Sequence, residues 1–98
     1  MELKAEMSKG VEVVERLADC LKAIGNPARF RIVEYCVKPR RFTDITLNLR
    51  LNPASFKFHS KVLKGCDLIE KVERGIYQTT VLGNMLLKLV NIASEMSD

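Results

Sequence analysis

The stretch from Leu51 to Tyr77 constrains the fold of this 98-residue chain more than any other. Its Asn52-Pro53 pair is typical of a helix start. Asn can accept a hydrogen bond from an orphan backbone N–H, and Pro at the first helical position lacks that donor. Phe56 and Leu63 lie seven residues apart and so share one helical face. We therefore expect a helix over about residues 53–65 that buries these two side chains and directs its lysines elsewhere (Lys57, Lys61 and Lys64).

The residues after this helix predict two short strands. Gly65 and Asp67 interrupt the helix, and Glu73-Arg74-Gly75 has the composition of a tight hairpin turn. We expect a hairpin over about residues 68–79 with a basic residue at its tip.

Two further helices are predicted upstream. The first is expected over residues 11–25, because apolar residues recur there at three- and four-residue spacing, and Gly25-Asn26-Pro27 ends it (Val11, Val14, Leu17, Ala18, Leu21 and Ile24). The second begins around Pro27, and its buried candidates are all apolar (Phe30, Ile32, Val33, Cys36 and Val37).

A basic turn, Lys38-Pro39-Arg40-Arg41, precedes a third short helix. Thr43 is its predicted N-cap, Asp44 suits its first turn, and Ile45 and Leu49 are its core residues. Because only residues 50–52 separate this helix from the next, the pair matches a helix-turn-helix. With the hairpin, the prediction is a mainly α fold with a small β-hairpin wing (α+β), a winged helix-turn-helix.

Composition indicates a single globular domain, since 47% of residues are hydrophobic and 29% are charged. No apolar run approaches the roughly 20 residues of a membrane span. The N-terminal segment lacks the apolar core of a signal peptide. We therefore expect a cytoplasmic protein without membrane contact.

The positive charge is concentrated in the middle of the chain. Residues 27–75 hold eleven Lys and Arg against five Asp and Glu, a net charge of +6, whereas residues 1–26 and 76–98 each carry −1. This distribution fits a central module that meets a polyanion, and it fits a solvated basic surface equally well.

No catalytic or metal-binding constellation is evident. Cys20, Cys36 and Cys66 are far apart, lack a CxxC pair, and are accompanied by one histidine, so we interpret them as thiols in or near the core. No phosphate loop, nucleophile beside a base, or close acidic cluster is present. We expect no enzyme activity, no cofactor and no metal.

Three motifs together resemble winged-helix transcriptional regulators of the ArsR and MarR groups, over about residues 14–90. A proline-led helix resembles the opening of the ArsR group (Pro27, Arg29 and Ile32). Residues 55–71 are similar to its recognition helix and following strand (His59, Leu63, Leu68 and Ile69). The exit from the wing is similar in both groups (Tyr77, Thr80 and Gly83).

The chain also departs from this family pattern. Metal-sensing ArsR members carry paired cysteines in the helix before the recognition helix, and residues 43–50 contain none. Ser60 stands where the family prefers leucine, which predicts a looser or shifted core there. Lys57 stands where the family often has serine, which adds charge.

The resemblance implies sequence-specific binding of double-stranded DNA, with the helix at about 53–65 in the major groove and the wing near the minor groove. Ser55, Lys57, Phe58 and Lys61 are the candidates for the helix surface, with His59 for a phosphate. Arg74 at the wing tip would lie in or beside the minor groove, and Arg40 and Arg41 at the flanking backbone, although all three fit ordinary turn residues equally well. For Phe58, packing elsewhere and exposure to DNA both stay open.

The segment 81–98 is expected to be a dimerisation helix. Its apolar stripe is wider than one supporting face needs (Leu82, Met85, Leu86, Leu89, Ile92 and Met96). In related regulators, the terminal helices form a two-fold dimer that presents recognition helices about 34 Å apart. We therefore predict a homodimer that uses its N- and C-terminal helices.

Two alternatives stay open. A winged helix can be a protein-interaction module without specific DNA binding, in which the basic helix is only surface. RNA binding is a weaker alternative, because the chain lacks paired aromatics on strands that would stack bases.

Overall fold

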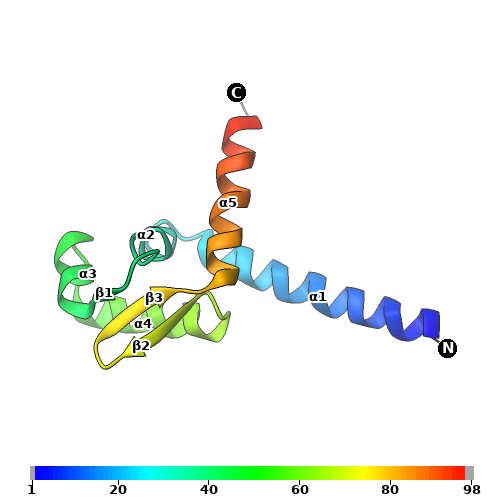
Figure 1. Cartoon of the computed structure of the whole chain (residues 1–98), viewed down its shortest axis with the longest axis horizontal. Coiled ribbons are helices and arrows are strands. Elements are labelled where there is room, and N and C mark those ends of the chain that lie inside the picture. Colours follow the sequence, from blue (N-terminus) through cyan, green and yellow to red (C-terminus); the bar gives the residue numbers. More distant parts are fainter. Residues whose placement is uncertain (1, 97–98) are drawn as a thin grey trace.

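The computed structural model describes residues 2–96 of the chain, and the side chains of residues 9–96. Five helices and a three-stranded antiparallel sheet follow one another as α1 (Glu2–Ile24), α2 (Pro27–Tyr35), β1 (Arg40–Arg41), α3 (Phe42–Asn48), α4 (Pro53–Gly65), β2 (Ile69–Glu73), β3 (Ile76–Thr79) and α5 (Val81–Met96). Figure 1 shows α3, α4 and the sheet gathered at one end, while α1 and α5 extend away in different directions.

Asparagine caps begin two of the helices. The Asn52 side chain accepts a hydrogen bond from the backbone N–H of Ser55 at 2.9 Å, and Pro53 follows at the first position of α4. This start and the end at Gly65 confirm the predicted helix. Asn26, which the sequence marked only as a helix end, caps α2 in the same way through the N–H of Arg29.

The predicted N-cap of α3 is wrong. The helix begins at Phe42, and its N-cap is Arg41, which makes no side-chain capping bond, so Thr43 lies inside the first turn. The cause is that Arg41 belongs to a strand, whose extended backbone leads directly into the helix. Asp44 occupies the first turn as predicted, and a short connection leads from α3 to α4.

The sheet contains a strand that the sequence did not predict. Its order is β1-β3-β2, and β1 pairs Arg40 with Tyr77 and Arg41 with Ile76. The predicted basic turn at residues 38–41 is therefore partly a strand. The hairpin of β2 and β3 is confirmed, with Gly75 at φ 76° in its turn, where a residue without Cβ is favoured.

The core lies where α2, α3, α4 and the sheet meet. Phe56 is fully buried, and its ring makes edge-to-face contacts with Phe42 and Tyr77, at centroid distances of 5.4 and 5.2 Å. Most of the other predicted core residues are also buried (Ile32, Val33, Cys36, Ile45 and Leu63). Phe30 and Leu49 are only half-buried.

Val37 is not a core residue, contrary to the prediction, since 43% of it is exposed. Helix α2 ends at Tyr35 with Cys36 as its C-cap, so Val37 lies beyond the helix and no longer follows its periodicity.

The chain leaves the wing through a tightly bonded corner. The buried Thr79 hydroxyl donates to the Val33 carbonyl at 2.6 Å, and the Thr80 hydroxyl accepts from the N–H of Gly83 at 3.0 Å, which caps α5. Gly83 closely approaches the backbone just before β2, because a Cβ there would lie 2.5 Å from the carbonyl oxygen of Leu68. These contacts give a physical reason for the residues of the wing-exit motif.

The two terminal helices carry apolar side chains that the monomer leaves exposed. Helix α1 is longer than predicted, since it begins at Glu2 rather than near residue 11. Leu86 is 2% exposed and packs into the core, so its assignment to a dimer interface is wrong. The other faces of both helices remain open (Val11, Val13, Val14, Leu17, Leu21, Met85, Leu89, Ile92 and Met96). Residues 97–98 of the predicted 81–98 segment lie outside the described residues.

Candidate nucleic-acid interface

The outer face of α4 combines two cations with an aromatic ring. Lys57 and Lys61 are one turn apart and exposed, and Phe58 beside them is 60% exposed. The opposite face is anchored by Phe56 and Leu63, both fully buried. The structure thus decides the open question about Phe58, whose ring is exposed with only an edge contact to His59 at 5.5 Å between centroids.

The two serines of α4 differ in position. Ser55 lies half-buried in the first turn, and its N–H is used by the Asn52 cap. Ser60 is buried, and its hydroxyl donates to the carbonyl of Lys57 at 3.1 Å. A small polar residue is therefore accommodated at this core position by a bond within the helix itself.

His59 is joined to Arg29, a contact that sequence reasoning missed. A guanidinium nitrogen of Arg29 lies 3.3 Å from Nδ1 of His59, and Arg29 Nε donates to the Ala23 carbonyl at 2.6 Å. Since a guanidinium only donates, Nδ1 must accept, which leaves the proton of a neutral ring on Nε2. Burial, and secondarily the charge of Arg29, lowers the pKa of His59 below its ordinary value.

Pairing of β1 with β3 brings Arg41 and Arg74 to a common pocket. The pocket has a volume of about 350 Å³ and lies at the turn of the wing, lined also by Phe42, Thr43, Gly75 and Ile76. The N–H of Phe42 donates to the Gly75 carbonyl at 2.8 Å, which holds the start of α3 against the turn of the wing. Both arginines are exposed, so this pocket offers two guanidinium groups to an anion.

Arg40 has a different environment from Arg41. Its guanidinium carbon lies 4.3 Å from the centre of the Tyr35 ring, and its Nε donates to the Tyr35 carbonyl at 2.9 Å. The Tyr35 hydroxyl in turn accepts from the Asn48 side chain at 2.6 Å. Arg40 therefore links α2 to the sheet, and its side chain is largely engaged within the protein.

The cations of the interface are not neutralised by neighbours. Within residues 9–96, the ion pair that the structure contains joins Arg16 to Asp67, away from the outer face of α4. In the same part of the chain, no three His, Cys, Asp or Glu side chains gather as a metal ion requires. None of the described helices combines the length and apolar character needed to cross a membrane.

The candidate residues therefore form two separate groups in the structure. Lys57, Phe58 and Lys61 form the outer face of α4, with Ser55 at its first turn and His59 beside it. Arg41 and Arg74 line the pocket at the turn of the wing, together with Thr43. The second group could not be predicted from the sequence, because it depends on the pairing of β1 with β3, which joins residues more than thirty positions apart.

A short helix, a four-residue turn, a second helix with an exposed basic face, and a β-hairpin packed beside it define a winged-helix fold. Among solved structures, the chain is similar to the crystal structure of the transcriptional regulator HlyU from Vibrio vulnificus CMCP6. The TM-score is 0.65 at 19% sequence identity, and the similarity covers 95% of this chain and 98% of that chain. No protein-family model and no curated protein sequence matches the chain. The likeness at this identity establishes the winged-helix fold.

Proposed function

We propose that this protein is a sequence-specific regulator of transcription that binds double-stranded DNA, with α4 in the major groove and the wing near the minor groove. The observation that carries the proposal is the outer face of α4, where Lys57 and Lys61 are exposed without an acidic partner on a helix whose other face is fixed in the core. The similarity in fold to HlyU, a transcriptional regulator, supports it.

Each residue of the outer face has a chemical role in this proposal. Lys57 and Lys61 reach phosphates or guanine edges, and Ser55 bonds to a phosphate or a base. The exposed ring of Phe58 suits an apolar contact with a thymine methyl group. His59, with its proton on Nε2, donates to a phosphate while Arg29 holds the ring in place.

The pocket at the turn of the wing extends the contact along the duplex. Arg41, Arg74 and Thr43 line it, so it suits a backbone phosphate beside the grooves. Arg40 acts indirectly, because its stacking on Tyr35 fixes the position of β1 and therefore of Arg41.

We further propose that the protein acts as a homodimer through α1 and α5. Leu82, Met85, Leu89, Ile92 and Met96 belong to the proposed interface, together with the exposed apolar residues of α1. A groove of about 230 Å³, lined by Val13, Arg16, Leu17, Cys20 and Leu82, separates the two helices. Exposed apolar faces of this extent mark association surfaces, and a second copy offers the same two faces by symmetry.

The test compares two double variants that remove equal charge. Lys57→Ala with Lys61→Ala changes the outer face of α4, whereas Lys9→Ala with Lys22→Ala changes exposed lysines of α1. We expect the first variant to bind duplex DNA at least about tenfold more weakly than the parent, with a shallower salt dependence. The α1 variant should keep the affinity of the parent. Equal affinity of the folded α4 variant and the parent would contradict the proposal.

One observation favours a second function. Phe58 is 60% exposed and Leu47 on α3 is 76% exposed, and such apolar side chains also suit a protein-interaction module. Under that alternative, the parent protein would bind no duplex DNA at low salt.

A further inference from the structure

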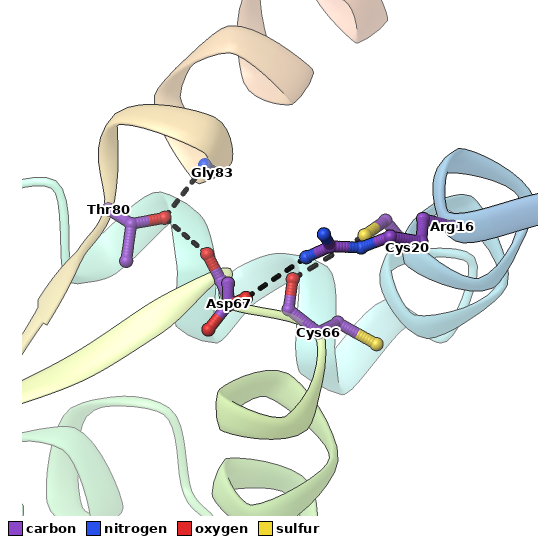
Figure 2. Close-up of polar contacts among 6 residues, drawn as sticks. All are labelled: Arg16, Cys20, Cys66, Asp67, Thr80 and Gly83. Carbon is purple, nitrogen blue, oxygen red and sulfur yellow. Dashed lines mark hydrogen bonds and ion pairs between the residues drawn. The ribbon is translucent and has the colours of Figure 1, made fainter. Parts of the chain in front are cut away.

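Two cysteines meet where the end of α4 touches α1. Cys20 on α1 donates its thiol proton to the carbonyl oxygen of Cys66 over 3.4 Å, and the Sγ of Cys66 lies 4.0 Å from the carbonyl oxygen of Asp19. Each sulfur thus contacts the backbone of the other cysteine or of its neighbour. Figure 2 shows the two side chains on the facing segments. A separation of 46 residues in the sequence becomes a contact between the Cys20 thiol and the Cys66 backbone in the fold.

The two thiols differ in access. They line a pocket of about 90 Å³ with Arg16, Asp19 and Gly65, and Cys66 is half-buried while Cys20 is buried. Burial, and then the nearby thiol of Cys66, raises the pKa of Cys20. A reagent in the pocket therefore meets Cys66 first, and Cys20 lies behind it as the second thiol.

The third cysteine provides an internal contrast. Cys36 is fully buried at the end of α2, where burial raises its pKa to about 12. It lies in none of these contacts and is shielded from solvent reagents, so it should remain a free thiol when Cys66 reacts.

The residue that follows Cys66 connects three helices. The Asp67 side chain pairs with Arg16 of α1 at 3.2 Å, and its carbonyl accepts from the Thr80 hydroxyl at 2.6 Å (Figure 2). Thr80 also caps α5 through Gly83. Asp67 itself has φ 57°, a left-handed conformation that few residues other than glycine adopt. A covalent bond at Cys66 would therefore act on α1, α4 and α5 together.

We propose that Cys20 and Cys66 form an oxidation site, which a low-molecular-weight disulfide converts into an intramolecular disulfide that weakens DNA binding. The Cys66 thiolate attacks one sulfur of the reagent, so that a protein–reagent disulfide forms and one reagent thiol leaves. Cys20 then attacks the sulfur of Cys66 and releases the second reagent thiol. Two protein thiols and one small disulfide become one protein disulfide and two small thiols.

The effect on DNA rests on the proposed function. A disulfide holds its sulfurs about 2.05 Å apart, so its formation takes the Cys20 thiol from the Cys66 carbonyl and draws the C-terminal end of α4 toward α1. Because α1 belongs to the proposed dimer interface, that movement changes the orientation of the recognition helix relative to its copy. The two helices then no longer match successive major grooves.

The first experiment maps the bond. The protein is equilibrated with oxidised and reduced glutathione at a series of ratios, and peptides are analysed by mass spectrometry without reduction. We expect a Cys20–Cys66 peptide pair within one chain, while Cys36 remains alkylatable. Glutathione retained on Cys66 without closure, or a disulfide between two copies, would overturn the proposal.

The second experiment measures duplex DNA affinity of the reduced and oxidised protein. Oxidation should weaken the affinity of the parent about tenfold, and it should leave the affinities of the Cys20→Ala and Cys66→Ser variants unchanged. If the parent with a mapped Cys20–Cys66 disulfide binds DNA as tightly as its reduced form, the proposed effect of oxidation on DNA binding is overturned. If the reduced parent binds no DNA, the proposed function and this effect of oxidation fail together, whereas the peptide map still decides whether the disulfide forms.

Discussion

The winged-helix module and the terminal helices differ in how far their apolar side chains are buried. In residues 27–80, the large apolar side chains of the inner faces are buried around Phe56, and the wing-exit corner is closed by side-chain hydrogen bonds. In α1 and α5, by contrast, apolar residues follow each helix on a face that no other part of the described chain covers. Figure 1 shows the same contrast as a compact end and two projecting helices.

This difference indicates that one set of residues determines the stability of the fold and another set determines association with a partner. The core is complete within one chain, since Cys20, Ala23 and Ile24 of α1 and Leu86 of α5 join the module residues, so the fold should depend little on a partner. The terminal helices have apolar faces that only another molecule can bury, so their residues should determine association. The basic middle and near-neutral ends of the sequence follow the same division.

The largest effect is expected from a change in the module core. Phe56→Ala removes the ring that packs between Phe42 and Tyr77 and should lower the free energy of unfolding by about 3–5 kcal/mol. Denaturant unfolding measures this loss. Phe58→Ala, on the exposed face, is the matched control and should change stability by less than about 0.5 kcal/mol. Similar losses for both variants would contradict the assignment of the two faces.

The next effect concerns association. Leu89→Asp combined with Ile92→Asp places charges on the open face of α5 and should raise the dimer dissociation constant about a hundredfold. Light scattering over a concentration series measures the change. Leu47→Asp, on a side chain of α3 that is even more exposed, should leave the oligomeric state unchanged. If the parent is a monomer, or if the double variant dimerises normally, the assignment of association to the terminal helices is contradicted.

A third prediction tests the corner that joins the two regions. Gly83→Ala places a Cβ 2.5 Å from the Leu68 carbonyl and from the Thr79 methyl group, and should destabilise the protein by about 1–3 kcal/mol. Gly10→Ala is the control, because no atom lies within 4 Å of its added Cβ. In an exposed helix interior, that change should stabilise α1 by up to about 1 kcal/mol. Thermal unfolding should show a lower melting temperature for Gly83→Ala and an unchanged or higher one for Gly10→Ala.

The smallest effect is a pH dependence from His59. Its folded pKa is lowered, so the unfolded chain binds the proton more readily, and stability is complete above the ordinary value of 6.5. As pH falls below 6.5 and through the folded pKa, we expect a loss of stability smaller than that caused by Gly83→Ala. The chain has one histidine, so His59→Gln should remove the part of the slope below pH 6.5 that this group causes. An unchanged slope in that variant would contradict the assignment.

Local signals in the sequence predicted much of the module. Asn52-Pro53 and the spacing of Phe56 and Leu63 fixed α4, because caps and helical faces depend on neighbouring residues. Pairing over long separations was not predictable in this way. Strand β1 consists of two arginines whose partners lie in the wing, and its extension also displaced the start of α3 from Thr43.

The candidate site was predicted in part for the same reason. The exposure of Lys57 and Lys61 follows from the helical face opposite Phe56, whereas the side on which Phe58 lay could not be decided without the packing. The wide stripe of α5 concealed which side faces the core, so Leu86 was assigned outward although it packs inward. The contacts of Arg29 with His59 and of Cys20 with Cys66 join distant segments and had no local signal.

The central claim is that a dimer presents the outer face of α4 to duplex DNA. Its most direct test is the affinity for duplex DNA across a salt series, measured on protein whose oligomeric state has been determined. We predict a dimer whose affinity falls linearly on a log–log plot, by at least about tenfold between roughly 50 and 200 mM salt, as counterion release requires. Absence of binding at about 50 mM salt, where such contacts are strongest, would contradict the account.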